Sequence, residues 1–344
     1  MRTSFISSYT LFNGPRSDFG RLQTEAGRLT TELATGRRAD LGLTLGSLAS
    51  RSIELRTATT SLSAMIDGNG AIVARLRQTD ATLARIAGDA DRFLQSALAA
   101  TDSVTTFAVL GQEAAQNLDA LVDALNVTDG RRYLFGGVNS AVRPMNAPSD
   151  GGAAAITAAF EAHFGFPPGD AAAIDIAPAD MADFLDAEVA DIAEGAGWSV
   201  WSNAADEPVA SRIAANETIA GSVSANAAPL RRLTAAYALF GQVGVQALNS
   251  ETRRVVIDRV RGAMAEGVTD MITLRADVGS GIRRTDDATE RMMRERDVIE
   301  LRTSALESVD PYEAKVRFDQ ISTQIQMSYA LTTRLLEMSI LNHA

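Results

Sequence analysis

Hydrophobic residues near the amino terminus follow alternating steps of three and four positions. The residues that follow this pattern are Phe19, Leu22, Ala26, Leu29 and Leu33. Such spacing gathers apolar side chains on one helix face and is typical of the seam of a heptad coiled coil. The pattern predicts a first helix that ends near Gly36, because glycine readily adopts the left-handed conformation of a C-terminal cap.

A longer apolar seam follows without a change of phase. Its members are Leu55, Ala58, Leu62, Met65, Asn69, Ile72, Leu76, Thr79, Leu83, Ile86, Ala90, Phe93 and Ala97. A helix carrying this seam would be roughly 65 to 70 Å long, so we expect a rod or part of a bundle. In "ATDSVTT", Asp102 or Ser103 can serve as an N-cap, which predicts a reversal into another helix. A single straight helix is the alternative.

Asn69 is a polar residue at a seam position, between Gly68 and Gly70. It could act as a register device, since a buried amide favours the pairing that satisfies its hydrogen bonds. The two glycines weaken the helix locally and favour the other interpretation, a frayed or partly wet layer.

The carboxyl-terminal part repeats the heptad step. The apolar series there is Ile257, Val260, Met264, Gly267, Met271, Leu274 and Val278. The following "GSG" predicts a break or kink at residues 279–281. A last helix should then begin at Pro311, with Asp310 as its N-cap.

The apolar residues of this last helix lie on two tracks. One track holds Phe318, Ile321, Ile325 and Leu335, and the other holds Met327, Leu331 and Met338. One partner helix cannot cover both tracks, so we expect contacts with other subunits.

The middle of the chain differs in composition from both ends and is rich in Gly, Pro, Asn and Asp. Short strands are predicted around Trp198, Val200, Ile213, Ile219 and Val223, with a short helix over residues 180–193. In "YLFGG", an extended segment should end the helical core, and the two glycines should turn the chain sharply into the insert.

These patterns predict a mainly α fold with an inserted small α+β or β domain. Both termini would form long antiparallel coiled-coil helices. Residues 1–135 and 231–344 would be the N-terminal and C-terminal helical arms of a discontinuous core, and residues 136–230 the inserted acidic domain.

Charge and composition narrow the class of protein. The net charge of −11 argues against nucleic-acid binding. Residues 137–230 hold 13 Asp and Glu against two Arg, whereas the arms hold 30 residues of each sign. The sequence has no cysteine, no apolar stretch of signal-peptide length at its start, and no run that predicts membrane insertion.

Candidate chemistry is sparse. His163 and His343 lie too far apart in sequence and in too different contexts to suggest a metal site. The only lysine, Lys315, has no phosphate-binding glycine motif around it. Trp198 and Trp201 are more typical of a small-domain core than of a sugar-stacking surface. We therefore expect no catalytic, cofactor-binding or metal-binding residues and no enzyme activity.

Three segments resemble one protein family. They are "MRTSFISSYTLF" with "LQTEAGRLTTELATGRR", then "GRRYLFGGVNSAVRPM", and the terminal "DPYEAKVRFDQISTQIQMSYALTTRLLEMSILNHA". Together they resemble the bacterial flagellin superfamily, and within it the hook-associated protein 3 family, found at the junction between hook and filament.

The resemblance implies a structural role in a junction ring on the extracellular bacterial flagellum. It implies type III export without a cleaved signal peptide. Implied partners are further copies of the chain, another hook-associated protein, filament flagellin and a type III export chaperone.

The apolar seams at both ends predict where copies would meet. The predicted assembly interface consists of Phe19, Leu22, Leu29, Leu33, Ile321, Ile325, Leu335 and Met338. Its helices should order when subunits stack. A filament flagellin is the main alternative. A secreted carbohydrate-binding protein or enzyme acting through the insert is a third hypothesis, which "GWSVWSN" and its acidic neighbours would favour.

Overall fold

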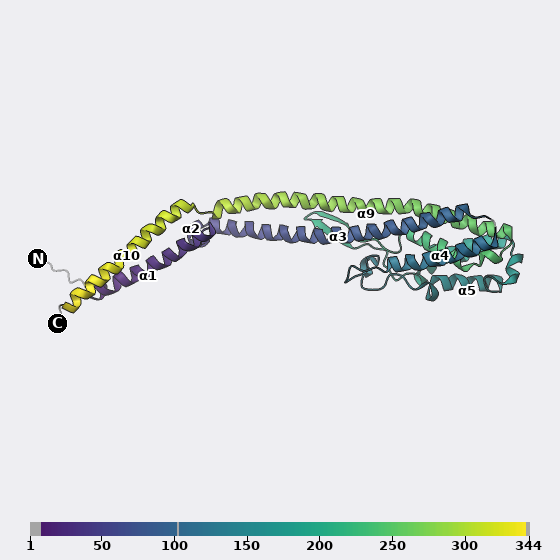
Figure 1. Cartoon of the computed structure of the whole chain (residues 1–344), viewed down its shortest axis with the longest axis horizontal. Coiled ribbons are helices and arrows are strands. Elements are labelled where there is room, and N and C mark those ends of the chain that lie inside the picture. The colour runs from purple at the N-terminus through teal and green to yellow at the C-terminus, as the bar shows by residue number, and fades with distance from the viewer. Residues whose placement is uncertain (1–7, 102, 342–344) are drawn as a thin grey trace. The chain divides into compact units, whose positions relative to one another are not determined.

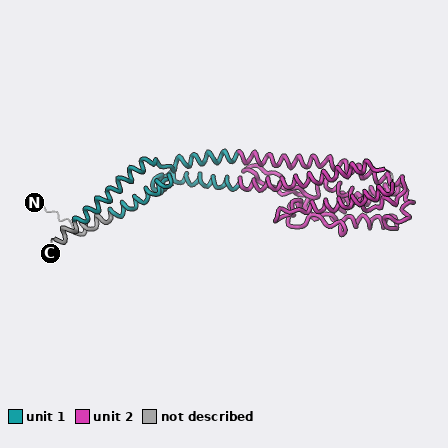
Figure 2. The backbone as a smooth tube through the Cα atoms, in the orientation of Figure 1, with its two compact units in different colours: residues 1–64, 291–344 teal, residues 65–290 magenta. Residues whose placement is uncertain are grey.

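The fold is seen in a computed structural model that describes residues 8–101 and 103–341, with side chains described over 18–101 and 103–334. The chain forms two compact units (Figure 2). Unit 1 consists of residues 1–64 and 291–344, and unit 2 of residues 65–290. Unit 1 therefore combines two segments far apart in the sequence, whereas unit 2 is one continuous segment.

Unit 1 contains two pairs of helices. Its elements are α1 (Ser8–Thr35), α2 (Leu41–Leu45), the start of α3 (Leu48–Ala99), the end of α9 (Ser250–Glu307) and α10 (Pro311–Leu341). Helices α1 and α10 lie side by side and antiparallel (Figure 1), with Phe19 against Tyr329 and Arg37 beside Ser308. The predicted ends are confirmed: Gly36 follows α1 with a φ of 66°, and Asp310 caps α10.

Unit 2 is built around four helical segments: the rest of α3, α4 (Val104–Leu125), α8 (Ala228–Gln242) and the first part of α9. The predicted seam of α3 is buried at Leu76, Leu83, Ile86, Ala90, Phe93 and Ala97. Helices α3 and α9 run antiparallel, because Asp80 pairs with Arg275 at 2.9 Å and the Ala97 carbonyl accepts from Arg261 at 2.6 Å.

The chain reverses after α3, as predicted. Ser103 caps α4 by accepting a hydrogen bond from the Thr106 N–H, while Asp102, the other candidate, lies outside the described residues. Arg75, in the middle of α3, donates to the carbonyl of Tyr133 at 2.9 Å. The chain therefore returns along α3, and the alternative of one straight helix was wrong.

The insert is mostly helical. Its α-helices are α5 (Gly152–Phe164), α6 (Pro178–Phe184) and α7 (Ala190–Glu194), and a π-helical turn, Leu185–Val189, joins the last two. Short 3-10 helices are η1 (Gly137–Asn139), η2 (Pro148–Asp150), η3 (Ala171–Asp175), η5 (Ala196–Val200) and η6 (Val245–Ala247), the last of which follows α8.

The strands of the described chain form one antiparallel hairpin, β1 (Ala210–Ala214) with β2 (Glu217–Ala220). The strands predicted around Ile213 and Ile219 are confirmed. Those around Trp198 and Val200 were wrong, because both residues lie in η5, and Val223 lies outside the hairpin. The predicted class, mainly α with a small β-containing insert, is confirmed.

The "YLFGG" segment performs the predicted turn. Leu134 and Phe135 are fully buried, and the Phe135 carbonyl accepts from the Ala225 N–H at 2.8 Å. Gly137 has a φ of 60°, and a Cβ there would lie 2.5 Å from the Ala205 carbonyl oxygen. Glycine is required at this position because both the backbone conformation and the close approach exclude a side chain.

The insert and the helices of unit 2 share one hydrophobic core. Buried residues of the insert, including Phe160, Phe184 and Trp201, belong to the same cluster as Phe93 and Tyr237. The compact units divide near residues 64 and 290. The predicted boundaries of the insert, at 135/136 and 230/231, mark a change in amino-acid composition and stay a prediction.

The "GSG" segment does not interrupt its helix, which corrects the prediction made for residues 279–281. Helix α9 runs without interruption from Ser250 to Glu307. Gly281 lies in the helix against Leu76 and Ile219, since a Cβ there would be 3.6 Å and 3.7 Å from their Cδ1 atoms. Packing along the helix outweighs the weak helical propensity of glycine.

Asn69 is the second correction. Instead of lying in a frayed or wet layer, it is fully buried. Its Nδ2 donates to the carbonyl of Ile213 at 2.9 Å and to Oγ1 of Thr289 at 3.0 Å, so it connects α3, the β hairpin and α9. Its position agrees with the register hypothesis, in which the amide favours one pairing of the helices.

We predict that Asn69→Ala destabilises unit 2 by about 1–3 kcal/mol, because it leaves the buried Ile213 carbonyl without a donor. Urea unfolding followed by circular dichroism measures the change. Asp67→Ala, on the exposed face of the same helix, is the control and should change stability by less than about 0.5 kcal/mol. Equal effects of the two substitutions would contradict a structural role for the amide.

Candidate assembly interface

The α1/α10 pair brings together the predicted interface residues whose side chains are described. Leu29 is buried, and Phe19, Leu22, Leu33, Ile321 and Ile325 are half-buried. They lie in the two helices that pack on one another within the same chain. The side chains of Leu335 and Met338 lie outside the described residues. One side of the predicted seam is therefore engaged inside the monomer.

One side of α10 carries a second set of large apolar side chains that remain open to solvent. It consists of Tyr312, Val316, Met327 and Leu331, whose exposed fractions range from 56% to 84%. At about 100° per residue these four side chains fall within an arc of about 100° on the helix. This outer face of α10 contains the second track expected from the sequence, with Met327 and Leu331, and one helix partner leaves it uncovered.

Exposed apolar side chains are concentrated in unit 1. Eleven of the nineteen exposed large hydrophobic residues in the described chain belong to it, although unit 2 is almost twice as long. Beyond α10 they include Leu43, Leu48, Ile53, Met293, Val298 and Leu301. Exposed large apolar side chains that gather in one part of a protein make it a candidate for protein–protein contact.

The loops that follow α1 and α9 are paired through their backbones. The Arg38 N–H donates to the Glu307 carbonyl at 2.8 Å, and the Val309 N–H donates to the Gly36 carbonyl at 3.1 Å. The α1/α10 pair is thus joined to the ends of α3 and α9 at one place within unit 1.

A buried carboxylate lies at this joint. Glu307 is fully buried and accepts hydrogen bonds from Arg56 Nε at 2.7 Å and Nη2 at 2.5 Å, as well as from the Ser52 hydroxyl. Arg37 Nη1 lies 3.8 Å from its Oε2. The Arg56 hydrogen bonds lower the pKa of Glu307 against the opposing effect of burial, with further help from Ser52 and the charges of Arg56 and Arg37.

This joint was missed in the sequence. Ser52 and Arg56 are four residues apart and so share a helix face, but Glu307 is about 250 positions away. Only the antiparallel pairing of α3 with α9 could have indicated that the three side chains meet.

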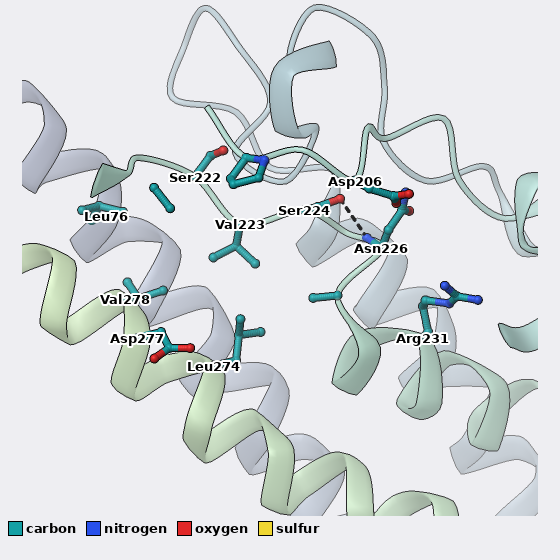
Figure 3. A pocket seen from close by; sticks show the side chains of 13 residues that line it. Leu76, Asp206, Ser222, Val223, Ser224, Asn226, Arg231, Leu274, Asp277 and Val278 are labelled. Atoms are coloured by element: carbon teal, nitrogen blue, oxygen red, sulfur yellow. Dashed lines mark hydrogen bonds between the residues drawn. The ribbon is translucent and has the colours of Figure 1, made fainter. Parts of the chain in front are cut away.

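The insert side of unit 2 has a pocket of about 400 Å³ (Figure 3). Leu76, Leu274 and Val278 form its helical wall. On the opposite side Asn226 donates to Asp206 at 2.7 Å and accepts from Trp198 Nε1 at 2.8 Å. These polar groups satisfy one another and hold separate parts of the insert together.

The tryptophans belong to the core, as the sequence favoured. Trp198 and Trp201 are both buried, and their ring centroids lie 6.2 Å apart. They offer no open surface on which a sugar could stack. His163 pairs with Glu188 at 3.0 Å on the surface of the insert.

The described residues offer neither a metal site nor a membrane-spanning helix. Within the described ranges 8–101 and 103–341, no group of three or more His, Asp or Glu is placed to hold a metal ion. Across the same part of the chain, no helix is both long and apolar enough to span a membrane.

The fold defines a class of structural protein: helices from the two ends of the chain pair with each other and enclose an insert. Two family models match the sequence. The bacterial flagellin N-terminal helical region matches residues 6–140, and the bacterial flagellin C-terminal helical region matches residues 262–343. Together they span more than half of the chain, which therefore belongs to the bacterial flagellin family. The chain is accordingly a structural component of the flagellum, an extracellular appendage.

One solved structure with a similar fold is that of a candidate flagellar hook-associated protein from Vibrio parahaemolyticus. Its TM-score is 0.54 at 8% identity, over 77% of this chain and 100% of that one. At this identity the likeness concerns the fold. A search of curated protein sequences gave no match.

We predict that Leu29→Ala opens the α1/α10 pair, because it removes a fully buried side chain and should cost about 2–5 kcal/mol. Amide hydrogen exchange of α1 and α10 should accelerate, while that of α4 stays constant. Thr30→Ala, at an exposed neighbouring position, is the matched control. If both variants exchange like the wild type, Leu29 does not hold the pair together.

Proposed function

We propose that this flagellin-family protein forms the junction ring between hook and filament, by packing its terminal helices against those of neighbouring copies. The observation that carries the proposal is the outer face of α10, which stays exposed although α10 is already paired with α1. The sequence resemblance of the amino-terminal and "YLFGG" segments supports the junction over the filament.

The predicted interface divides into two parts in this proposal. The described residues of the first seam hold α1 and α10 together within each subunit, and the outer face of α10 meets the next subunit. Burying an apolar side chain at such a contact contributes about 1.5–3 kcal/mol. A ring built from many copies of this contact needs only modest affinity at each one.

Charge supports the same arrangement. The arms are electrically balanced, with 30 acidic and 30 basic residues, and so allow close packing of copies. The insert carries the whole net charge of −11. Placed outward, it would keep exported subunits soluble by mutual repulsion.

The remaining partners in the proposal follow from the resemblance. They are another hook-associated protein on the hook side, filament flagellin on the other side, and a type III export chaperone before assembly. Export would proceed without a cleaved signal peptide. We propose no enzyme activity, cofactor or metal for this chain.

We predict that Met327→Glu together with Leu331→Glu abolishes self-association without unfolding the monomer, because each new carboxylate would have to be buried in the subunit contact. Analytical ultracentrifugation and electron microscopy measure assembly, and circular dichroism checks the fold. Gln326→Glu places the same charge at another exposed position of α10 and is the control. Normal assembly of the double variant would refute a role for the outer face.

The size of the assemblies separates the two flagellar roles. A junction protein should stop at a closed ring, whereas a filament flagellin should extend without limit when seeded on filament fragments. Deletion of the gene gives a second test: hooks should remain while filament subunits are lost to the medium. Unlimited growth from seeds would replace the junction role by the filament role.

We predict that limited proteolysis of the monomer removes roughly the first forty and the last forty residues and leaves a core of about residues 55–304. A single pair of helices buries too little surface to resist cleavage without neighbouring copies. Mass spectrometry identifies the surviving fragment. Protected termini with a cleaved insert would show that the α1/α10 pair needs no neighbouring copies for its stability, and would contradict this prediction.

A further inference from the structure

Glu307 lies where α9, α3 and the loops next to α1 and α10 come together in unit 1. It is the last residue of α9, and its carboxylate is bound by Ser52 and Arg56 of α3. Its backbone carbonyl accepts from Arg38 in the loop after α1. Four residues further on, α10 begins at Pro311. Both chain connections, the one that leaves α1 towards α3 and the one from α9 to α10, therefore pass beside this one side chain.

The joint is otherwise held by few contacts. Two backbone hydrogen bonds pair the loops around Gly36 and Val309, and Glu32 supports the first loop by accepting from the Ala39 N–H at 3.2 Å. Loops with so few bonds open easily unless a stronger contact fixes them. The bidentate Arg56 pair is such a contact, because hydrogen bonds between ionised groups are about twice as strong as neutral ones.

We propose that Glu307 is a charge latch that fixes the α1/α10 pair to the start of α3, and that neutralising this one carboxylate releases the pair. The latch acts within a single subunit. Its consequence for assembly, that released helices no longer present the outer face of α10 in one orientation, rests on the proposed function.

The surroundings of Glu307 favour its ionised form. Arg56 faces it from α3 and Arg37 from the loop after α1, both with positive charge. Glu32 is engaged with Ala39 and Arg28 at the same loop. A neutral side chain at position 307 offers Arg56 and Ser52 only one uncharged carbonyl oxygen, so the two-pronged ionic contact with Arg56 is lost.

The pH dependence follows from the lowered pKa of Glu307. A carboxyl group whose pKa is lower in the folded protein stabilises it fully above the ordinary value of 4.5, and this contribution is lost as pH falls through the folded pKa. The latch is thus closed at neutral pH and opens only in acid below 4.5.

The test compares Glu307→Gln with Glu300→Gln in the full-length protein. Glu300 lies on the same helix, but its carboxylate is exposed and pairs at 3.6 Å with Arg296. We expect amide hydrogen exchange of residues 36–40 and 307–310 at neutral pH to accelerate at least about tenfold in Glu307→Gln only. Peptides from α4 provide the internal reference.

A second pair of variants distinguishes local release of the latch from general unfolding of Glu307→Gln. Arg56→Lys keeps the charge and loses the two-pronged contact, so it should accelerate exchange at the same residues by a smaller factor. Ser52→Ala removes one donor and should act in the same direction. On acidification below 4.5 the wild type should approach Glu307→Gln.

Equal exchange in Glu307→Gln and Glu300→Gln would overturn the latch, as would a wild type that shows no acid-dependent opening. The test uses monomer and is independent of ring formation. A wild type that never assembles would refute the proposed function and leave the exchange comparison intact. A latch that fails in a protein that still assembles would refute the latch alone.

Discussion

The structure depends on antiparallel pairing between helices from opposite ends of the chain. Within unit 2, α3 and α9 are held by Asp80 with Arg275 and by Arg261 on the Ala97 carbonyl. Within unit 1, α1 lies along α10. The α3/α9 pair supplies the scaffold of unit 2, and the insert packs against it in one shared hydrophobic core.

Helix pairing also explains which features could be predicted. The seams, the reversal at Ser103 and the start of α10 at Asp310 are periodic or capping signals, so they appear in the local sequence. The helical content of the insert was underestimated, because its Gly, Pro and Asn residues suggested strands where Trp198 and Val200 form a 3-10 helix. Short apolar runs do not distinguish these two states.

The errors at glycine have one physical cause. Gly68 and Gly70 beside Asn69, and the "GSG" of α9, suggested weak points because glycine lowers helix propensity. Each lies in a long helix with a packed partner, where tertiary contacts outweigh that cost. The Glu307 joint could not be predicted, since its partners come together only through the topology.

The pairing of α1 with α10 also sets an order of events in time. Phe19 and Tyr329, which meet in this pair, are separated by more than three hundred residues of chain. Closing so large a loop costs entropy, and no part of the contact exists until the last helix is available. A chain emerging from its amino terminus thus carries an unpaired first helix until the end. The α1/α10 pair is therefore the last contact of the subunit to form.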